Sequence, residues 1–503
     1  MNGATSRTMS RTLAAAPIAS LAFVAMLALA AITVRNGLVA DDTLRLWAGA
    51  STAADGQVPI GRIVAGYPTL PFLATTLVAW LAPAGTPAPA LVAAALFSLI
   101  AAFCFLAFRR AGFHYVFAIG ATLLIAFHPA LLRAVIGGPA DMFLATFLLM
   151  LCLALYNLRA RSGTSEVMGV GLALMALAFS HPVGAALAFA AVPFLAFAVR
   201  PVLVASSALN MVIALIFPTL FMVAAFAYVS WIFPGDGWSF FSAPAESLSL
   251  WTAAAARIFG NGLSGIPAID ASLAMGVALA IGAPVALAML ALVHRRRPLV
   301  VPAAVFLGTA IAATAICVAS GFFGDPTAIV VAAPVLAATV VIRVPVARER
   351  IFTVTALLIL GWIGGFLGLA LVDPITVNRL LHTAFEQGAS ERLDAVAAGG
   401  ASAERDGVLV DTSNAPALVL GRGRARGILG PNSEPFALAL LFARIDTPFV
   451  AVPDPQSTTG ANDRLDKAFP SLFRAGLAGY RVIYQNNTWR LFARLKDATV
   501  SKQ

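Results

Sequence analysis

Two adjacent carboxylates, Asp41 and Asp42, stand at the border between an apolar run and a mixed segment, in the stretch VADDTLRLW at 39–47. The chain contains only 23 acidic residues among 503, so neighbouring acids are scarce. The segment that follows has apolar residues at 44, 46–48 and 50, which is typical of a helix lying in a membrane interface. Acids in its first turn favour the helix N-terminus. A carboxylate at a membrane surface can also accept the proton of a substrate hydroxyl.

The composition indicates an integral membrane protein. Hydrophobic residues make up 60% of the chain and charged residues only 11%, whereas a soluble domain carries about 25% charged residues. Repeated apolar runs of about 16–28 residues are long enough to cross a bilayer. The net charge of +10 comes mainly from Arg residues between these runs. We interpret them as topology signals rather than as a nucleic-acid surface.

The arginines predict the topology. The first apolar run, 12–34, is longer than the 7–15 residues or so of a signal-peptide core, so we expect a retained helix with a cytoplasmic N-terminus. Short basic connections alternate with connections that carry Asp, His, Pro and aromatic residues, as the positive-inside rule requires. Further apolar segments lie near 90–108, 113–128, 141–157, 167–180, 183–199, 203–231, 271–293, 299–320, 326–342 and 351–372.

One short segment, PTLPFLATTLVAWLAP at 68–83, breaks this alternation if it spans the membrane. As a juxtamembrane or re-entrant helix on the outer face it restores the pattern. We therefore expect an α-helical polytopic protein of the bacterial inner (plasma) membrane with about eleven transmembrane helices. The C-terminus is then periplasmic or extracellular. Residues 361–368, GWIGGFLG, have glycines at a spacing that indicates close helix packing.

After the last apolar segment, short strand and helix patterns replace the long apolar runs. GVLVDTSN at 407–414 and TPFVAVPDP at 447–455 each predict a strand, and PFALALLFAR at 435–444 predicts a helix. GYRVIYQNNTWRLFARL at 479–495 predicts two strands joined by an Asn-Asn turn. We expect a transmembrane catalytic domain over 1–372, with a first outer loop at 35–67, and a small extracytoplasmic α/β domain over 373–503.

The first outer loop carries a recognisable series of motifs. The acidic pair and the interfacial helix are followed by DGQVP at 55–59 and GYPTLPF at 66–72. This order resembles the GT-C superfamily, the integral-membrane glycosyltransferases that use polyprenyl-phosphate sugars, and within it the dolichyl-phosphate-mannose mannosyltransferase-like enzymes. Many members have Tyr-Pro-Pro-Leu where this chain has Tyr67-Pro68-Thr69-Leu70. The Tyr or Phe that often follows the acids is replaced by Leu44 and Leu46.

The resemblance implies roles for several residues. An Asp of the pair serves such enzymes as catalytic base or orients the base, so we predict Asp41 or Asp42 as the base, with inversion at the anomeric carbon. The segment HPALLRAVIGGPADMF at 128–143 resembles the region where an Arg and an Asp follow a Pro near the membrane surface. Arg133 or Arg62 is expected near the lipid phosphate, although Arg133 also fits a snorkelling role. Asp141 caps its helix or reaches toward the site.

Three further residues are substrate-binding candidates. Tyr67 belongs to the GYPTLPF motif, and His128 and His181 each precede a Pro at the outer end of a span. A structural role is the more common one for a histidine in this position, and a substrate contact is the alternative. No spacing of metal ligands is present, so we assign no cofactor, and a divalent cation at the acidic pair stays open.

The predicted function is transfer of a sugar from a polyprenyl-phosphate donor to a glycan, lipid or protein acceptor on the extracytoplasmic face. The expected partners are these substrates and membrane lipids, with no nucleic acid. The main alternative is a transporter or flippase of lipid-linked glycans, which would place ionisable groups in mid-membrane. A lipid-linked-glycan polymerase or ligase of another fold, and a non-enzymatic scaffold or sensor, also stay open.

Overall fold

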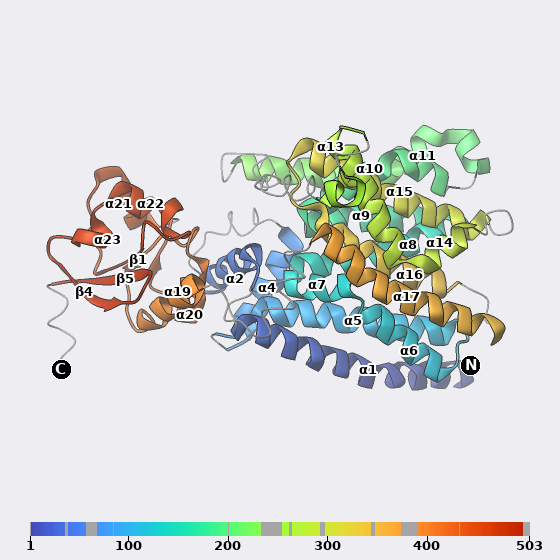
Figure 1. Cartoon of the computed structure of the whole chain (residues 1–503), viewed down its shortest axis with the longest axis horizontal. Helices are drawn as coiled ribbons and strands as arrows, with labels where there is room; N and C mark the ends of the chain where they lie inside the picture. Colours follow the sequence, from blue (N-terminus) through green and yellow to red (C-terminus); the bar gives the residue numbers. More distant parts are fainter. Residues whose placement is uncertain are drawn as a thin grey trace. The chain divides into compact units, whose positions relative to one another are not determined.

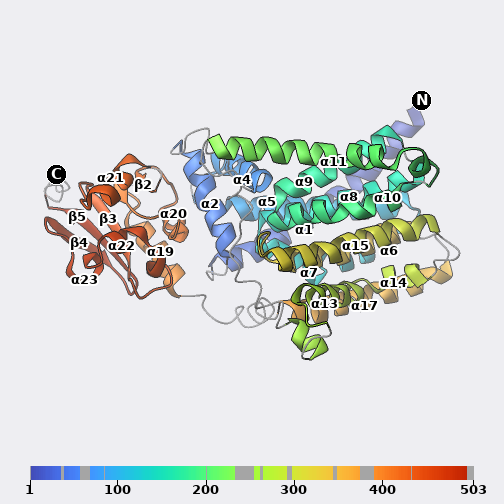
Figure 2. The same cartoon turned by 90° about the horizontal axis from the view of Figure 1, so that it is seen from above.

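The computed structural model describes residues 2–35, 39–56, 68–83, 85–161, 163–199, 201–232, 254–260, 264–291, 297–343, 348–373, 390–431 and 433–495. Its internal contacts divide the chain into two compact units (Figures 1 and 2). Unit 1 comprises residues 1–30, 65–71 and 93–382. Unit 2 comprises residues 31–64, 72–92 and 383–503, and therefore joins most of the first loop to the C-terminal domain.

Unit 1 is a bundle of apolar helices. Helices α1 and α5 begin or end in the other unit and are given with their full extents. The helices are α1 (Asn2–Arg35), α5 (Ala88–Arg110), α6 (Tyr115–Ala126), α7 (Pro129–Gly137), α8 (Pro139–Arg161), α9 (Thr164–Ser180), α10 (Pro182–Ala198), α11 (Pro201–Ile232), α13 (Pro267–Gly282), α14 (Pro284–Ala291), α15 (Arg297–Ser320), the 3₁₀ helix η2 (Pro326–Val331), α16 (Ala332–Val341) and α17 (Arg348–Val372).

Several of these helices could span a membrane, which is consistent with a multi-pass membrane protein. Within the described residues, six helices are long and apolar enough to cross a membrane, and α6 and α7 add a seventh span if the pair, bent by 53°, is counted as one. The other apolar helices of unit 1 are too short by themselves for an upright span, which needs about 20 residues. They are α9, α10, α13 and the combined η2–α16 segment.

The polar residues of unit 1 segregate to opposite ends of its helices. At one end, Arg159 Nη1 donates to the Val199 carbonyl at 2.5 Å, and the Arg343 guanidinium lies 3.9 Å from the centre of the Tyr156 ring. The other end carries Asp141 at the start of α8, His181 between α9 and α10, Asp325 before η2 and Asp373 after α17. The exceptions are His114 and Glu166, which lie at the arginine-rich end, and Arg133, which pairs with Asp141 and Asp373. This separation is the one that the arginine pattern predicts.

The glycines of α17 allow its close approach to α13. A side chain at Gly364 would collide with the carbonyl oxygen of Ile281, and one at Gly361 or Gly368 would meet a carbonyl oxygen at 3.0 Å. The interpretation of GWIGGFLG as a packing motif is therefore confirmed. Without a hydrophobic driving force between helices in lipid, such close contacts hold the bundle together.

Unit 2 contains α2 (Asp41–Ala54), most of α4 (Thr69–Leu81) and a five-stranded sheet. The strand order is β2-β1-β3-β5-β4, with β1 parallel to β2 and β3, and β5 antiparallel to β3 and β4. The strands are β1 (Val408–Leu409), β2 (Ile428–Leu429), β3 (Phe449–Pro453), β4 (Tyr480–Gln485) and β5 (Trp489–Arg494).

Alternate side chains of the sheet pack into two cores. On one face, Val408, Ala451 and Leu491 contact α19 (Ser390–Ala401) and α20 (Pro416–Arg422). On the other, Leu409, Val450 and Phe492 form a core with residues of α21 (Glu434–Phe442), α22 (Arg464–Ala468) and α23 (Leu472–Ala475). The predicted α/β domain is thus present. The strands expected near 408, 449, 480 and 489 and the helix expected near 435 are confirmed.

Candidate functional site

The acidic pair occupies the first turn of α2, as predicted. Asp41 Oδ1 accepts a hydrogen bond from Arg392 Nη2 at 2.6 Å, and Arg392 Nη1 donates to the Val39 carbonyl at 2.8 Å. Asp42 is different: its side chain is 95% exposed, and Arg45 Nη1 lies 3.9 Å away. Arg392 therefore holds Asp41 in place, and Asp42 is the more accessible carboxylate.

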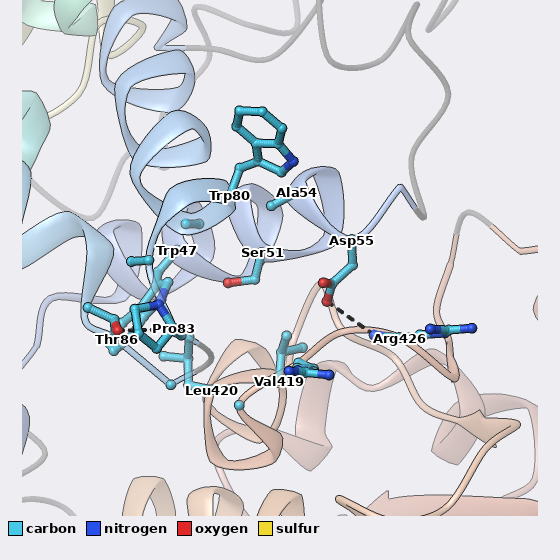
Figure 3. Close-up of a pocket in the computed structure, with 15 residues that line it drawn as sticks. Trp47, Ser51, Ala54, Asp55, Trp80, Pro83, Thr86, Val419, Leu420 and Arg426 are labelled. Atoms are coloured by element: carbon cyan, nitrogen blue, oxygen red, sulfur yellow. Dashed lines mark hydrogen bonds between the residues drawn. The ribbon is translucent and has the colours of Figure 1, made fainter.

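A cavity of about 380 Å³ lies along the second half of the same helix. Trp47, Ser51 and Asp55 line it from α2, because residues four apart share one face of a helix. Figure 3 shows these three side chains along α2, with residues from the α4 end and from the C-terminal domain around them. Neither Asp41 nor Asp42 lines this cavity. The remaining lining residues are Ala54, Ala79, Trp80, Ala82, Pro83, Gly85, Thr86, Val419, Leu420, Gly423, Arg424 and Arg426.

One carboxylate fixes the loop that closes the cavity. Asp55 Oδ2 accepts hydrogen bonds from the backbone N–H groups of Ala425 at 2.6 Å and Arg426 at 3.2 Å. This loop follows α20 and belongs to the stretch GRGRARG at 421–427. Gly423 and Gly427 have φ values of 76° and 81°, a left-handed conformation that glycine adopts without steric cost.

The segment 128–143 forms a buried ionic cluster in unit 1. Arg133 Nη1 lies 2.8 Å from Asp141 Oδ2, and Arg133 Nε lies 3.3 Å from Asp373 Oδ2. The side chains of Arg133, Asp141 and Asp373 are 15%, 11% and 12% exposed. Gly137 leaves room for the Asp141 carboxylate, since a side chain there would collide with it. The charge of Arg133 is thus compensated by two carboxylates within the protein.

His181 belongs to the same cluster. Its Nε2 lies 3.2 Å from Asp141 Oδ1, and its Nδ1 accepts a hydrogen bond from the Val183 N–H at 3.1 Å. Because Nδ1 is an acceptor, the ring proton is on Nε2, and the Nε2–H group donates a hydrogen bond to Asp141. Both ring nitrogens are therefore occupied, and the ring caps α10 while it orients Asp141.

His128 has a similar structural role. Its Nδ1 accepts from the Ala130 N–H at 3.2 Å, and its Nε2 lies 3.1 Å from the Gly361 carbonyl and 3.3 Å from the Gly282 carbonyl. With one nitrogen accepting, Nε2 is the donor to the two carbonyl groups. The buried ring thus caps α7 and ties it to α13 and α17.

Two predicted site residues, Arg62 and Tyr67, lie outside the described residues. The structure adds four residues to which the sequence analysis assigns no role: Asp373 beside Arg133, Arg392 beside Asp41, and Arg424 and Arg426 at the cavity. The sequence placed Asp373 on the same side of the membrane as Arg133, but nothing in it indicated the pairing. The residues around Arg392 in the sequence do not indicate its role, because its partner Asp41 is 351 positions away.

Two further carboxyl groups are buried in the C-terminal domain. Asp466 is 5% exposed, and neither of its oxygens has a hydrogen-bond partner among the described residues; the same is true of Asp463 Oδ2. Burial raises the pKa of Asp463 to about 6. Burial, with the nearby charges of Asp463 and Asp454, raises the pKa of Asp466 to about 7. Both groups therefore bind protons more tightly in the folded domain than in the unfolded chain.

Neither cluster has the geometry of a metal centre. In the part of the chain that the structure describes, no group of three or more His, Cys, Asp or Glu residues is arranged to hold a metal ion. Comparison of the chain with family models, with curated proteins and with solved structures finds no match in any of the three. A functional proposal for this chain therefore depends on its sequence and on the geometry of its own side chains.

Proposed function

We propose that the protein is a membrane glycosyltransferase of the GT-C type. It moves a sugar from a polyprenyl-phosphate donor to an acceptor on the extracytoplasmic face. The observation that carries this proposal is the accessible carboxylate of Asp42 at the start of α2, next to an Asp41 that Arg392 anchors. An exposed carboxylate can be reached by a substrate hydroxyl, whereas the carboxylate of Asp41 is already held by the Arg392 guanidinium at 2.6 Å.

The arrangement of charges in unit 1 supports a one-sided membrane enzyme. If the short helices α9, α10, α13 and η2–α16 also cross the bilayer, they complete the expected eleven spans together with the six long helices and the bent α6–α7 pair. By the positive-inside rule, the helix ends with Arg159 and Arg343 then face the cytoplasm, and the ends with Asp141, His181 and Asp373 face the periplasm. In this proposed topology the C-terminal α/β domain lies outside the bacterial inner membrane.

The proposed chemistry needs one base. The acceptor hydroxyl attacks the anomeric carbon of the donor while its proton passes to the Asp42 carboxylate. The bond between the anomeric carbon and the phosphate oxygen breaks, and polyprenyl phosphate leaves with the electron pair. Attack opposite the leaving group inverts the configuration at the anomeric carbon. No step requires a metal ion or a redox cofactor.

The test is a transfer assay with the purified full-length protein in proteoliposomes. A panel of radiolabelled polyprenyl-phosphate sugars is incubated with envelope glycans, lipids or proteins, and both the free polyprenyl phosphate and the labelled product are quantified. The proposal predicts that at least one donor is consumed and that the product has the inverted anomeric configuration. Movement of intact lipid-linked sugars between leaflets without donor cleavage would instead identify a flippase.

A further inference from the structure

The cavity of unit 2 has a positively charged rim that the proposed reaction does not use. Arg424 and Arg426 are both exposed there. Among the described residues, neither guanidinium has a carboxylate oxygen within 4.0 Å. Their neighbour Arg422 is buried and donates instead to the carbonyl groups of Ser402 and Arg426. Two uncompensated guanidinium groups at one rim suit a phosphate group, which accepts several charge-assisted hydrogen bonds.

The rim is held in a defined place. The carboxylate of Asp55 accepts from two successive backbone N–H groups of the loop, so one of its oxygens is committed to the loop backbone. In Figure 3 the side chain of Arg426 extends outward from this loop while Asp55 approaches its backbone. The arginine side chains remain available to a ligand at the cavity mouth.

The α4 end contributes apolar residues to the cavity lining, and one of them, Trp80, also belongs to an exposed apolar stripe. Leu73, Leu77, Trp80 and Leu81 of α4 are all exposed, and their spacing places them on one helix face. A stripe of large apolar side chains on a short helix is typical of a segment that lies in the membrane interface. Trp80 belongs both to the stripe and to the cavity lining, so a lipid chain lying along α4 leads into the cavity.

We propose that this cavity binds the phosphate head of a membrane lipid, with the phosphate at Arg424 and Arg426 and the hydrocarbon chain along the exposed face of α4. The volume of about 380 Å³ lies within the range of pockets that hold small ligands. The positive charge of the arginine rim complements the negative phosphate, and the apolar side chains of α4 suit the hydrocarbon chain. The buried indole of Trp47 forms the floor beside them.

The length of α2 indicates which lipid this is, a step that depends on the proposed function. Thirteen residues separate Asp42 from Asp55, which corresponds to about 20 Å along the helix axis. A phosphate next to Asp55 is too far from Asp42 to be the leaving group of a reaction at that carboxylate. The cavity therefore holds the phosphate of the second substrate, a lipid-linked glycan acceptor whose hydroxyl reaches Asp42 several sugar units away.

The test measures equilibrium binding of radiolabelled polyprenyl diphosphate to the full-length protein in phosphatidylcholine nanodiscs. We expect the Arg424→Gln/Arg426→Gln variant to bind about tenfold or more weakly, since charge-assisted contacts are lost. Arg481→Gln, which removes an exposed arginine that does not line the cavity, should leave the affinity unchanged. Replacement of both rim residues with lysine should restore part of the affinity. Trp80→Ser should weaken binding of the lipid without weakening binding of inorganic diphosphate.

Competitors separate the possible sources of the phosphate. Unlabelled polyprenol should displace the probe poorly, and inorganic diphosphate should do so only at concentrations at least about 100-fold higher than the lipid. Equal binding by the wild type and the glutamine variant, or equal competition by polyprenol or by inorganic diphosphate, would overturn the proposal. The probe could bind as predicted while no polyprenyl-phosphate sugar is cleaved in the transfer assay. That result would support the lipid site but contradict the proposed glycosyltransferase function, and the identification of the lipid as the acceptor would fall with it.

Discussion

Substitution of Arg133 separates two roles that the sequence alone left open, a contact with the lipid phosphate and a structural one. Arg133→Gln removes the guanidinium that pairs with two buried carboxylates, Asp141 and Asp373. Removing one partner of a buried ion pair costs roughly 3–5 kcal/mol, and the 11–12% exposure of these two side chains places them in that regime. We expect a loss of stability of this size.

The assay is reversible unfolding of the purified protein in mixed micelles of increasing SDS content. A double-mutant cycle with Asp141→Asn should show a coupling energy of about 1–3 kcal/mol, because the two side chains are in contact. Arg161→Gln, which removes an 80%-exposed guanidinium 3.9 Å from Glu166, should cost less than about 1 kcal/mol, because the charge that it removes is in water. An Arg133→Gln protein as stable as the wild type but with weakened donor binding would refute the structural role and restore the phosphate role.

Two further predictions concern packing and pH. Because its pKa is raised by burial from 3.8 to about 7, Asp466 contributes stability that is present below pH 4 and is lost as the pH rises through 7. At pH 8, Asp466→Asn should therefore raise the free energy of unfolding of the α/β domain by roughly 2–4 kcal/mol relative to the wild type. At pH 4, where the wild-type carboxyl group is protonated, this stabilisation should be absent. Hydrogen exchange in β3 and β5 measures this, and an equal difference at both pH values would contradict it. Gly364→Ala should lower the free energy of unfolding in SDS by more than about 2 kcal/mol, because the added carbon would collide with the carbonyl oxygen of Ile281. Gly169→Ala, with no atom near the added carbon, should be neutral or stabilising, and equal costs would disprove the packing role.

The sequence predicted the elements of the fold well where a clear periodicity exists. The alternation in 479–495 identified β4 and β5, and the acids at 41 and 42 marked the start of α2. The segment near 271–293 was expected as one helix but is interrupted at Ala283, before Pro284. The physical reason is that proline has no N–H for the helical ladder and clashes with the preceding turn, a signal that hydropathy does not weigh.

The candidate sites were less predictable because they depend on contacts between distant segments. Arg133 meets Asp373 across 240 positions, and Asp55 meets Arg426 across 371 positions. Hydropathy and charge spacing place such residues on one side of the membrane, but they do not pair them. His128 illustrates the same limit: its position before a proline allows both a structural role and a substrate contact, and only the fold shows both ring nitrogens bonded to the backbone.

The most direct test of the central claim is the rate of sugar transfer by the Asp42→Asn protein from the donor identified for the wild type. We predict a loss of about 100-fold or more, a smaller loss for Asp41→Asn, and no further loss in the double variant. Glu404→Gln, at an exposed carboxylate of the C-terminal domain, should transfer sugar as the wild type does. Wild-type rates in both the Asp42→Asn and the double variant would contradict the account.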